Sequence, residues 1–156
     1  MDVASFDEIA GEFDRRVRRI VWCSMATQDR QGRLRSRIIH PIWEGPRGWI
    51  ATAKTLKAKH LAQNPWVSLS YWDPRHEQVY VDAKAEWEDD PATKQRIWDL
   101  YKDTPPPLGY DPALFFQSVD SPTYSVLKLT PWRIELWNIG DMAGGKPPLV
   151  WRQPVE

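Results

Sequence analysis

The sequence contains little cysteine and histidine, no long apolar run and no excess of charge of either sign. Its single cysteine, Cys23, excludes an intrachain disulfide, and its apolar neighbours predict an inert buried thiol. No apolar run approaches about 20 residues and the first residues lack a signal-peptide pattern, so we expect a cytoplasmic protein with no membrane partner. The 21 basic residues balance 21 acidic residues, which argues against a nucleic-acid partner.

Motifs typical of several enzyme classes are also missing. The histidines His40, His60 and His76 do not have the spacing of metal ligands, so we predict no metal site. There is no glycine-rich phosphate loop, and Ser118 and Ser121 lack the histidine and aspartate companions of a hydrolase. For His40 two interpretations stay open, a structural role and a contact with a bound ring or substrate.

Tryptophan, by contrast, is abundant. Ten tryptophans are spread along the chain, and hydrophobic residues make up 42% of its 156 residues, enough for one domain with a real core. The simplest interpretation is that they fill a core and a dimer interface. The alternative is that one or two of them wall an aromatic ligand.

The apolar pattern alternates between the periods of strands and helices. Strands are predicted over 20–28, 33–43, 49–53, 66–72, 77–88 and 123–138, the last bent at Pro131. Helices are predicted over 5–18, 55–63, 91–102 and 111–118.

This order lacks a repeated strand–helix–strand rhythm. We therefore predict a mainly β (α+β) fold, an antiparallel barrel of about six strands with flanking helices. Residues 1–140 are expected to form a single domain. The Gly/Pro-rich tail, 141–156, is expected to be disordered or to lie on a partner.

Basic residues concentrate in one part of this neutral chain. Residues 30–60 hold eight arginines and lysines and one acid, a local charge of +8 − 1 = +7. The second predicted strand places Arg35 and Arg37 on one face, and the second predicted helix carries Thr55 and Lys57 in its first turn. Guanidinium, amine, hydroxyl and helix-start N–H groups together can hold a phosphate. The alternative is a solvated basic face.

The segment WIATAKTLKAKHLAQNPWVSLSY resembles the flavin-phosphate segment of the pyridoxamine 5′-phosphate oxidase-like split barrels. In that family a strand ending Tyr-Thr-Asn is followed by Ser-Arg-Lys and a helix ending Asn-Pro, and an arginine on the preceding strand is followed by apolar residues. The resemblance implies cofactor binding by the residues at matching positions, which are Arg35, Arg37, Ile38, Ile39, Ile50, Ala51, Thr52, Thr55, Leu56 and Lys57. Arg37, Thr55 and Lys57 would hold the phosphate, with the apolar residues along the ring.

Two further segments match in order. His76-Glu77-Gln78-Val79 resembles the family's Arg-Gln-Val strand, and the stretch ending at Trp137 resembles one that ends Ile-Glu-Phe-Trp. The resemblance implies that Gln78 and Trp137 of a second subunit close the other side of the ring. It implies a homodimeric split β-barrel with two cofactors at the subunit interface.

The implied cofactor is FMN or, as in a sister branch of these proteins, the deazaflavin F420. F420 carries an acidic tail in addition to its phosphate. Arg33, Lys54 and Lys59 lie beyond the phosphate-binding residues in the sequence, and they would serve such a tail or simply be solvated. The contacts that match are those of the flavin enzymes, which favours FMN.

The chain also departs from the oxidases proper. Their substrate-holding Arg-Leu-His-x-Arg motif is missing after Trp137, Leu56 stands where they have arginine, and 89–121 has no counterpart. We therefore expect an FMN- or F420-dependent oxidoreductase that acts on a small molecule, not one that oxidises vitamin B6. A non-catalytic carrier or sensor for a flavin, F420 or a tetrapyrrole is the alternative. The substrate and the catalytic residues stay open.

Overall fold

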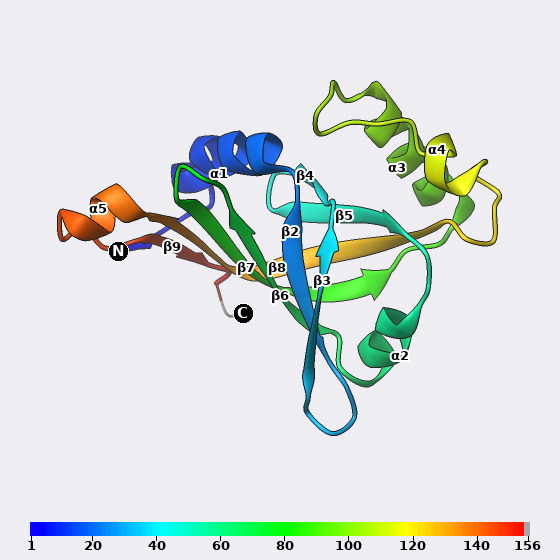
Figure 1. The fold of residues 1–156 in the computed structure, drawn as a ribbon, viewed down its shortest axis with the longest axis horizontal. Helices are drawn as coiled ribbons and strands as arrows, with labels where there is room; N and C mark the ends of the chain where they lie inside the picture. The colour runs from blue at the N-terminus through cyan, green and yellow to red at the C-terminus, as the bar shows by residue number, and fades with distance from the viewer. Residues whose placement is uncertain (155–156) are drawn as a thin grey trace.

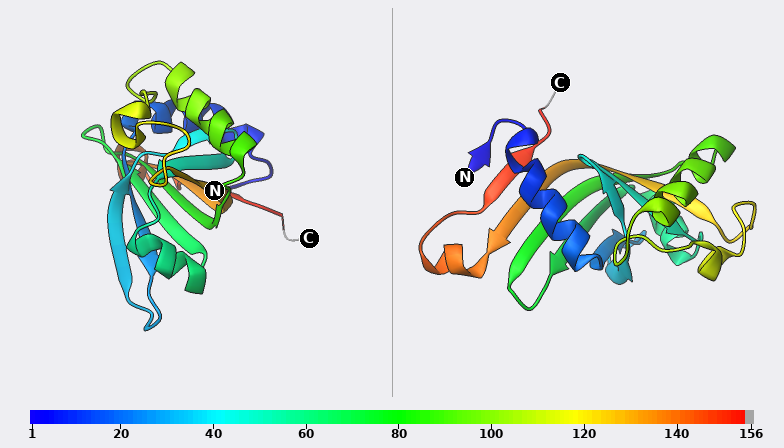
Figure 2. Two further views of the ribbon diagram at one scale, coloured as in Figure 1. Left: turned by 90° about the vertical axis from the view of Figure 1, so that its right-hand side faces the viewer. Right: turned by 90° about the horizontal axis from the view of Figure 1, so that it is seen from above.

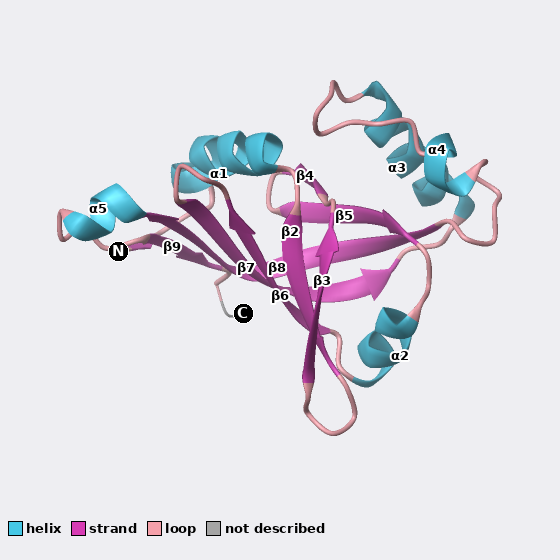
Figure 3. Ribbon diagram, in the orientation of Figure 1, coloured by secondary structure: helices cyan, strands magenta, loops and turns pink. Residues whose placement is uncertain are grey.

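A computed structural model describes residues 1–154. The strands are β1 Asp2–Val3, β2 Cys23–Gln28, β3 Leu34–Ile39, β4 Ile42–Glu44, β5 Arg47–Thr52, β6 Trp66–Trp72, β7 Glu77–Trp87, β8 Ser125–Asn138 and β9 Leu149–Arg152 (Figure 1). The helices are α1 Asp7–Ile20, α2 Leu56–Gln63, α3 Pro91–Asp103, α4 Ala113–Phe116 and α5 Ile139–Ala143 (Figure 3).

The sheet is organised around the long strand β8. Along one edge β8 pairs with β7, and along the other it pairs first with β5 and then with β9, so the sheet forks there. From β7 the order continues through β6 and β2 to β3, and all these pairs are antiparallel. The register between β7 and β8 shifts where Asp82 faces Arg133 and Ala83 faces Pro131, a bulge at the predicted bend.

Apolar side chains from both the sheet and α1 form the main core. Ile9, Phe13 and Val17 lie on one face of α1 and pack on this core, and each is 1% exposed. Figure 2 shows α1 crossing over the curved strands. A second core lies under α3 and includes Trp49, Tyr101 and other aromatic residues. Figure 1 places α3 and α4 together at one end of the sheet, opposite α5.

The structure confirms a mainly β fold with flanking helices, but residues 1–154 form nine strands where about six were expected. The predicted strand 33–43 is interrupted at His40 and Pro41, so that β4 is a separate short strand paired with β5. The predicted helix 5–18 begins and ends two residues later. Within residues 1–154, no helix has the length and apolar character that crossing a membrane would require.

The expectation of a disordered or partner-bound tail was wrong for the described residues. After α5 the chain returns as β9, which pairs antiparallel with β8 and parallel with β1. Burial explains this path, because Trp151 is only 7% exposed and packs in the main core against Phe6, with ring centroids 5.6 Å apart. The last two tail residues, 155 and 156, lie outside the described residues.

Replacing Trp151 tests the role of β9. We expect Trp151→Ala to lower the free energy of unfolding by ~3–5 kcal/mol, because it removes a buried indole and leaves a cavity. Trp132→Ala is the matched control, since Trp132 is 44% exposed, and it should cost much less. Urea unfolding of both variants measures the difference. Equal small losses would contradict the assignment of the tail to the core.

Candidate functional site

Strand β3 presents a partly buried guanidinium beside the start of α2. Arg37 is the Cα partner of Met25 on β2, and its Nη1 donates to Thr27 Oγ1 at 2.9 Å. Thr27 is 1% exposed, and its hydroxyl also lies 2.8 Å from Nδ1 of the buried His60. The Thr27 oxygen accepts from Arg37, and the same hydroxyl is hydrogen-bonded to His60 Nδ1. Arg37 is thus oriented from β2 and from α2.

The first turn of α2 places a second cation close to Arg37. Thr55 is the N-cap residue of α2, and its backbone is extended. Lys57 Nζ donates a hydrogen bond to Thr55 Oγ1 at 3.1 Å. Lys57 is 6% exposed, and burial together with the Arg37 guanidinium lowers the pKa of its amine. We call Arg37, Thr55 and Lys57 the basic notch.

The basic notch contains no compensating acid. Among the described residues, neither Arg37 nor Lys57 forms an ion pair, and the buried Arg37 Nη2 has no hydrogen-bond partner. Burial and the neighbouring Arg35 lower the pKa of Arg37. A buried and a partly buried cation that lack a carboxylate fit an anion such as a phosphate, which would supply both the charge and the missing acceptor. The predicted residues Arg37, Thr55 and Lys57 are therefore brought together.

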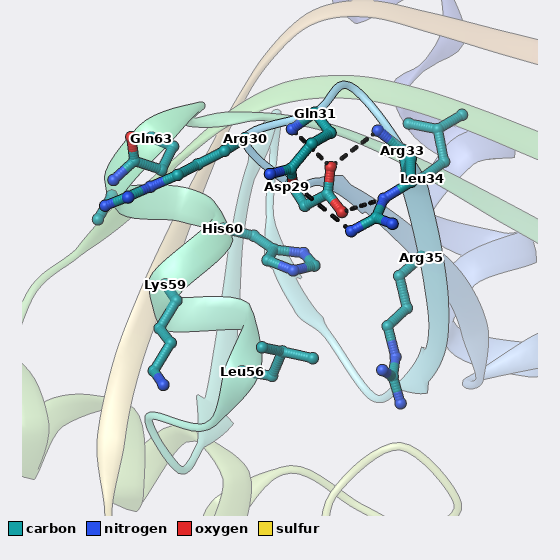
Figure 4. Close-up of a pocket in the computed structure, with 11 residues that line it drawn as sticks. Asp29, Arg30, Gln31, Arg33, Leu34, Arg35, Leu56, Lys59, His60 and Gln63 are labelled. Carbon is teal, nitrogen blue, oxygen red and sulfur yellow. Dashed lines mark hydrogen bonds and ion pairs between the residues drawn. The ribbon is translucent and has the colours of Figure 1, made fainter.

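A larger opening of about 930 Å³ lies between the β2–β3 hairpin and α2 (Figure 4). Leu56, Lys59 and His60 face it from α2, and Arg35 faces it from β3. We call it the basic cleft. Of the three cations considered for an acidic tail, Lys59 lines this cleft, as does Arg33, which pairs with Asp29 at 2.7 Å. Lys54 instead pairs with Asp89.

The predicted ring contacts lie together in another opening of about 290 Å³. One wall comes from strand ends and the residue that follows β5: Ile38, Ile39, Ile50, Ala51, Thr52 and Ala53. The remaining lining residues are aromatic and form what we call the aromatic wall: Trp22, His40, Tyr110, Phe115 and Phe116. We call this opening the aromatic cleft. His40 donates through Nε2 to the Leu108 carbonyl at 2.6 Å, which is a structural contact, and its ring also lines the cleft, so both interpretations of this residue stay open.

Gln78 and Trp137 lie elsewhere in the chain. They are Cα partners on β7 and β8, and Arg16 Nη1 donates to the carbonyl of each, at 3.0 Å to Gln78. Neither lines the basic cleft or the aromatic cleft. In the sheet, β6 and β2 lie between β7 and β3, so Gln78 and Trp137 are not neighbours of Arg37, and their assignment to a second subunit stays a prediction.

Two contributions to the site were missed in the sequence. Thr27 and His60 support Arg37, yet a threonine in an apolar strand and a lone histidine carry no motif. The aromatic wall comes largely from 89–121, which matched no family segment. Among residues 1–154, no cluster of three or more potential metal ligands is found.

Comparison with known proteins gives one family and one fold. The family model described as pyridoxamine 5′-phosphate oxidase matches residues 9–138. A Clostridium acetobutylicum protein related to general stress protein 26 of B. subtilis superposes with a TM-score of 0.74 at 14% identity, covering 94% of this chain and 95% of that one. An FMN-binding protein of Nostoc punctiforme gives 0.63 at 16% identity, with 88% and 86% covered.

Two other structures share the fold but carry different names. An F420 reductase superposes with a TM-score of 0.57 at 22% identity, over 78% of this chain and 94% of that one. The heme storage protein HutZ of Vibrio cholerae gives 0.61 at 16% identity, over 79% and 89%. Enzymes and a storage protein thus share this fold. No curated protein sequence matches the chain significantly.

Added phosphate tests the basic notch directly. At constant ionic strength, phosphate should raise the melting temperature of the cofactor-free protein, because it binds only the folded state and each charge-assisted hydrogen bond is worth ~1.5–3 kcal/mol. The gain should shrink as the pH rises through the lowered pKa of Lys57, since the neutral amine no longer attracts the anion.

A matched pair of variants controls for nonspecific effects of phosphate. Lys57→Ala should lose most of the gain in melting temperature. Lys102→Ala removes an exposed lysine from α3 and should keep it. Equal gains in both variants would show that the anion does not bind at the basic notch.

Proposed function

The chain belongs to the pyridoxamine 5′-phosphate oxidase family, and from this we propose that it is an oxidoreductase that binds FMN, with F420 as the alternative, and acts on a small molecule. The names of similar structures support both cofactors, since one is an FMN-binding protein and one an F420 reductase. FMN is preferred because the matching segments are those of the flavin enzymes.

The basic notch is the observation that carries the proposal. Arg37 and Lys57 would hold the phosphate, with Thr55 and the free N–H groups at the start of α2 as further donors. The Thr27 hydroxyl keeps the guanidinium of Arg37 in place, so little side-chain freedom is lost on binding.

The aromatic cleft supports the placement of a ring. Ile38 and Ile39 directly follow Arg37 on β3, and Ile50 to Thr52 end strand β5. These residues would exclude water from the ring and orient it, while the bound cofactor supplies the hydride chemistry. This division of labour accounts for a site without an acid–base pair of side chains.

Oxidation of pyridoxamine phosphate itself is not proposed. The residues after Trp137, where the oxidases proper carry their substrate-holding arginines, form α5 and β9 here. The only arginine in this stretch is Arg152, and it pairs with Asp2.

We further propose that the functional unit is a homodimer. The resemblance assigns Gln78 and Trp137 to the ring of the opposite subunit, and in a single chain two strands, β6 and β2, separate β7 from the strand β3 that carries Arg37. A site shared between copies would explain both observations.

A non-catalytic carrier of the same fold is the second candidate. The heme storage protein among the similar structures favours it, as does the lack of an acid–base pair. A carrier would bind cofactor tightly without oxidising it when a substrate is added. Assays of reduced-cofactor oxidation with quinones, enones and nitroaromatics separate the two candidates.

Titration with FMN and with F420, followed by ring fluorescence, tests the proposed function. We expect at least one to bind. The double variant Arg37→Ala/Lys57→Ala should bind at least about a hundredfold more weakly, because two charge-assisted hydrogen bonds to the phosphate are lost. Lys102→Ala is the control and should bind normally. If neither cofactor binds the unaltered protein, the proposal fails.

Mixing two variants tests the shared site. Lys57→Ala alters the phosphate end and Gln78→Arg blocks the ring side, so each homodimer should bind FMN poorly. In a randomly mixed population half of the dimers are hybrids with one intact site, which restores about a quarter of the binding sites. A mixture that binds no more FMN than the separate variants would rule out a shared site.

A further inference from the structure

The segment 89–121, in which the sequence analysis found no family motif, folds over the aromatic cleft. Helix α3 packs over β5 and β8, and the chain then turns back through Leu108 and Tyr110 to α4. Figure 1 shows α3 and α4 together above the end of β5. The segment supplies Tyr110, Phe115 and Phe116 to the lining of the cleft.

The rings of this wall form a continuous row. Ring centroids are 4.8 Å apart from Trp22 to His40, 5.1 Å from His40 to Tyr110 and 5.4 Å from Tyr110 to Phe115. Phe116 follows at 6.4 Å from Phe115. Such a row offers ring faces and edges to another ring, the arrangement in which aromatic groups attract each other.

The position of Tyr110 is fixed by backbone contacts. Its N–H donates to the Tyr101 carbonyl at 3.0 Å, and the Tyr101 hydroxyl donates to the carbonyls of His40 and Trp49. Gly109 is required for this path, because a Cβ there would lie 1.6 Å from the Thr104 carbonyl oxygen. The aromatic wall is thus preformed.

The cleft is uncharged. No aspartate, glutamate, lysine or arginine lines it. Burial lowers the pKa of His40 and raises the pKa of Tyr110 to about 12, so both are neutral near pH 7. At the same time Trp22, Ile38 and Phe115 are 56%, 67% and 68% exposed, which leaves large apolar surface at the opening.

We propose that this aromatic wall binds the substrate, and that the substrate is a flat, uncharged aromatic molecule. As a statement about the substrate, this rests on the proposed function, in which the cofactor ring lies along the strand wall of the same cleft. Charged molecules are disfavoured because no lining group would compensate a buried charge. Apolar molecules without an aromatic ring would bury apolar surface in the cleft but would not stack on the aromatic wall.

Three nitro compounds of similar size separate these effects. Equilibrium dialysis against the FMN-loaded, oxidised protein, without reductant, measures binding alone. We expect 4-nitroanisole to bind, and 4-nitrobenzoate to bind at least about tenfold more weakly because of its charge. Nitrocyclohexane, uncharged but not aromatic, should bind about three- to tenfold more weakly.

Paired variants locate the binding. Phe115→Leu and Trp22→Leu keep an apolar side chain but remove a ring, and each should weaken 4-nitroanisole binding about three- to tenfold. The controls are Leu114→Ala, on α4 but 78% exposed and outside the lining, and Trp132→Leu, on β8. Both controls should bind as the unaltered protein does.

The remaining outcomes bear separately on the two proposals. If FMN binds but 4-nitroanisole does not, the aromatic wall is no substrate site. The same conclusion follows if added FMN displaces bound 4-nitroanisole. Neither outcome contradicts the proposed function. A second copy covering the cleft would give the same failure. If FMN does not bind, the same dialysis is run on the cofactor-free protein. If the cofactor-free protein binds 4-nitroanisole more tightly than 4-nitrobenzoate and nitrocyclohexane, the assignment of the aromatic cleft is supported although the proposed function has failed.

Discussion

The site depends on two cations, Lys57 buried and Arg37 partly buried, that form no ion pair among the described residues. Arg37 lies close enough for its charge to lower the pKa of the Lys57 amine. Lys57 itself is only 6% exposed to solvent. Such an arrangement costs folding free energy, since both desolvation and repulsion disfavour it. It is held by Thr27, His60 and Thr55, whose hydrogen bonds come from β2 and α2. A bound anion would offset that cost in folding free energy.

Charge and apolar surface are separated within a short distance along β3. Arg37 contributes to the basic notch, and the next two residues, Ile38 and Ile39, line the uncharged aromatic cleft. A molecule with an anionic end and a flat neutral ring matches this order. FMN and F420 both have that form, which is why the two remain close alternatives for this site.

Different segments of the chain supply the basic notch and the aromatic wall. Strand β3 and the start of α2 supply the basic notch, and segment 89–121 supplies most of the aromatic wall, all within the matched residues 9–138. Strand β9 lies outside the matched residues, pairs with β8 and buries Trp151. Variation in the segments around a shared barrel is a physical route by which one fold serves a reductase and a storage protein.

Local periodicity and short motifs were enough to predict most helices and strands and the mainly β class. They also predicted that Arg37, Thr55 and Lys57 lie close together. These features could be predicted because strand alternation and a helix start are set by neighbouring residues. The sequence did not predict β9, β4 or the place of Thr27 and His60. Those depend on contacts between residues far apart in the chain, such as Trp151 with Phe6 and His60 with Thr27. Only the tertiary structure decided them, since burial and register are properties of the assembled sheet.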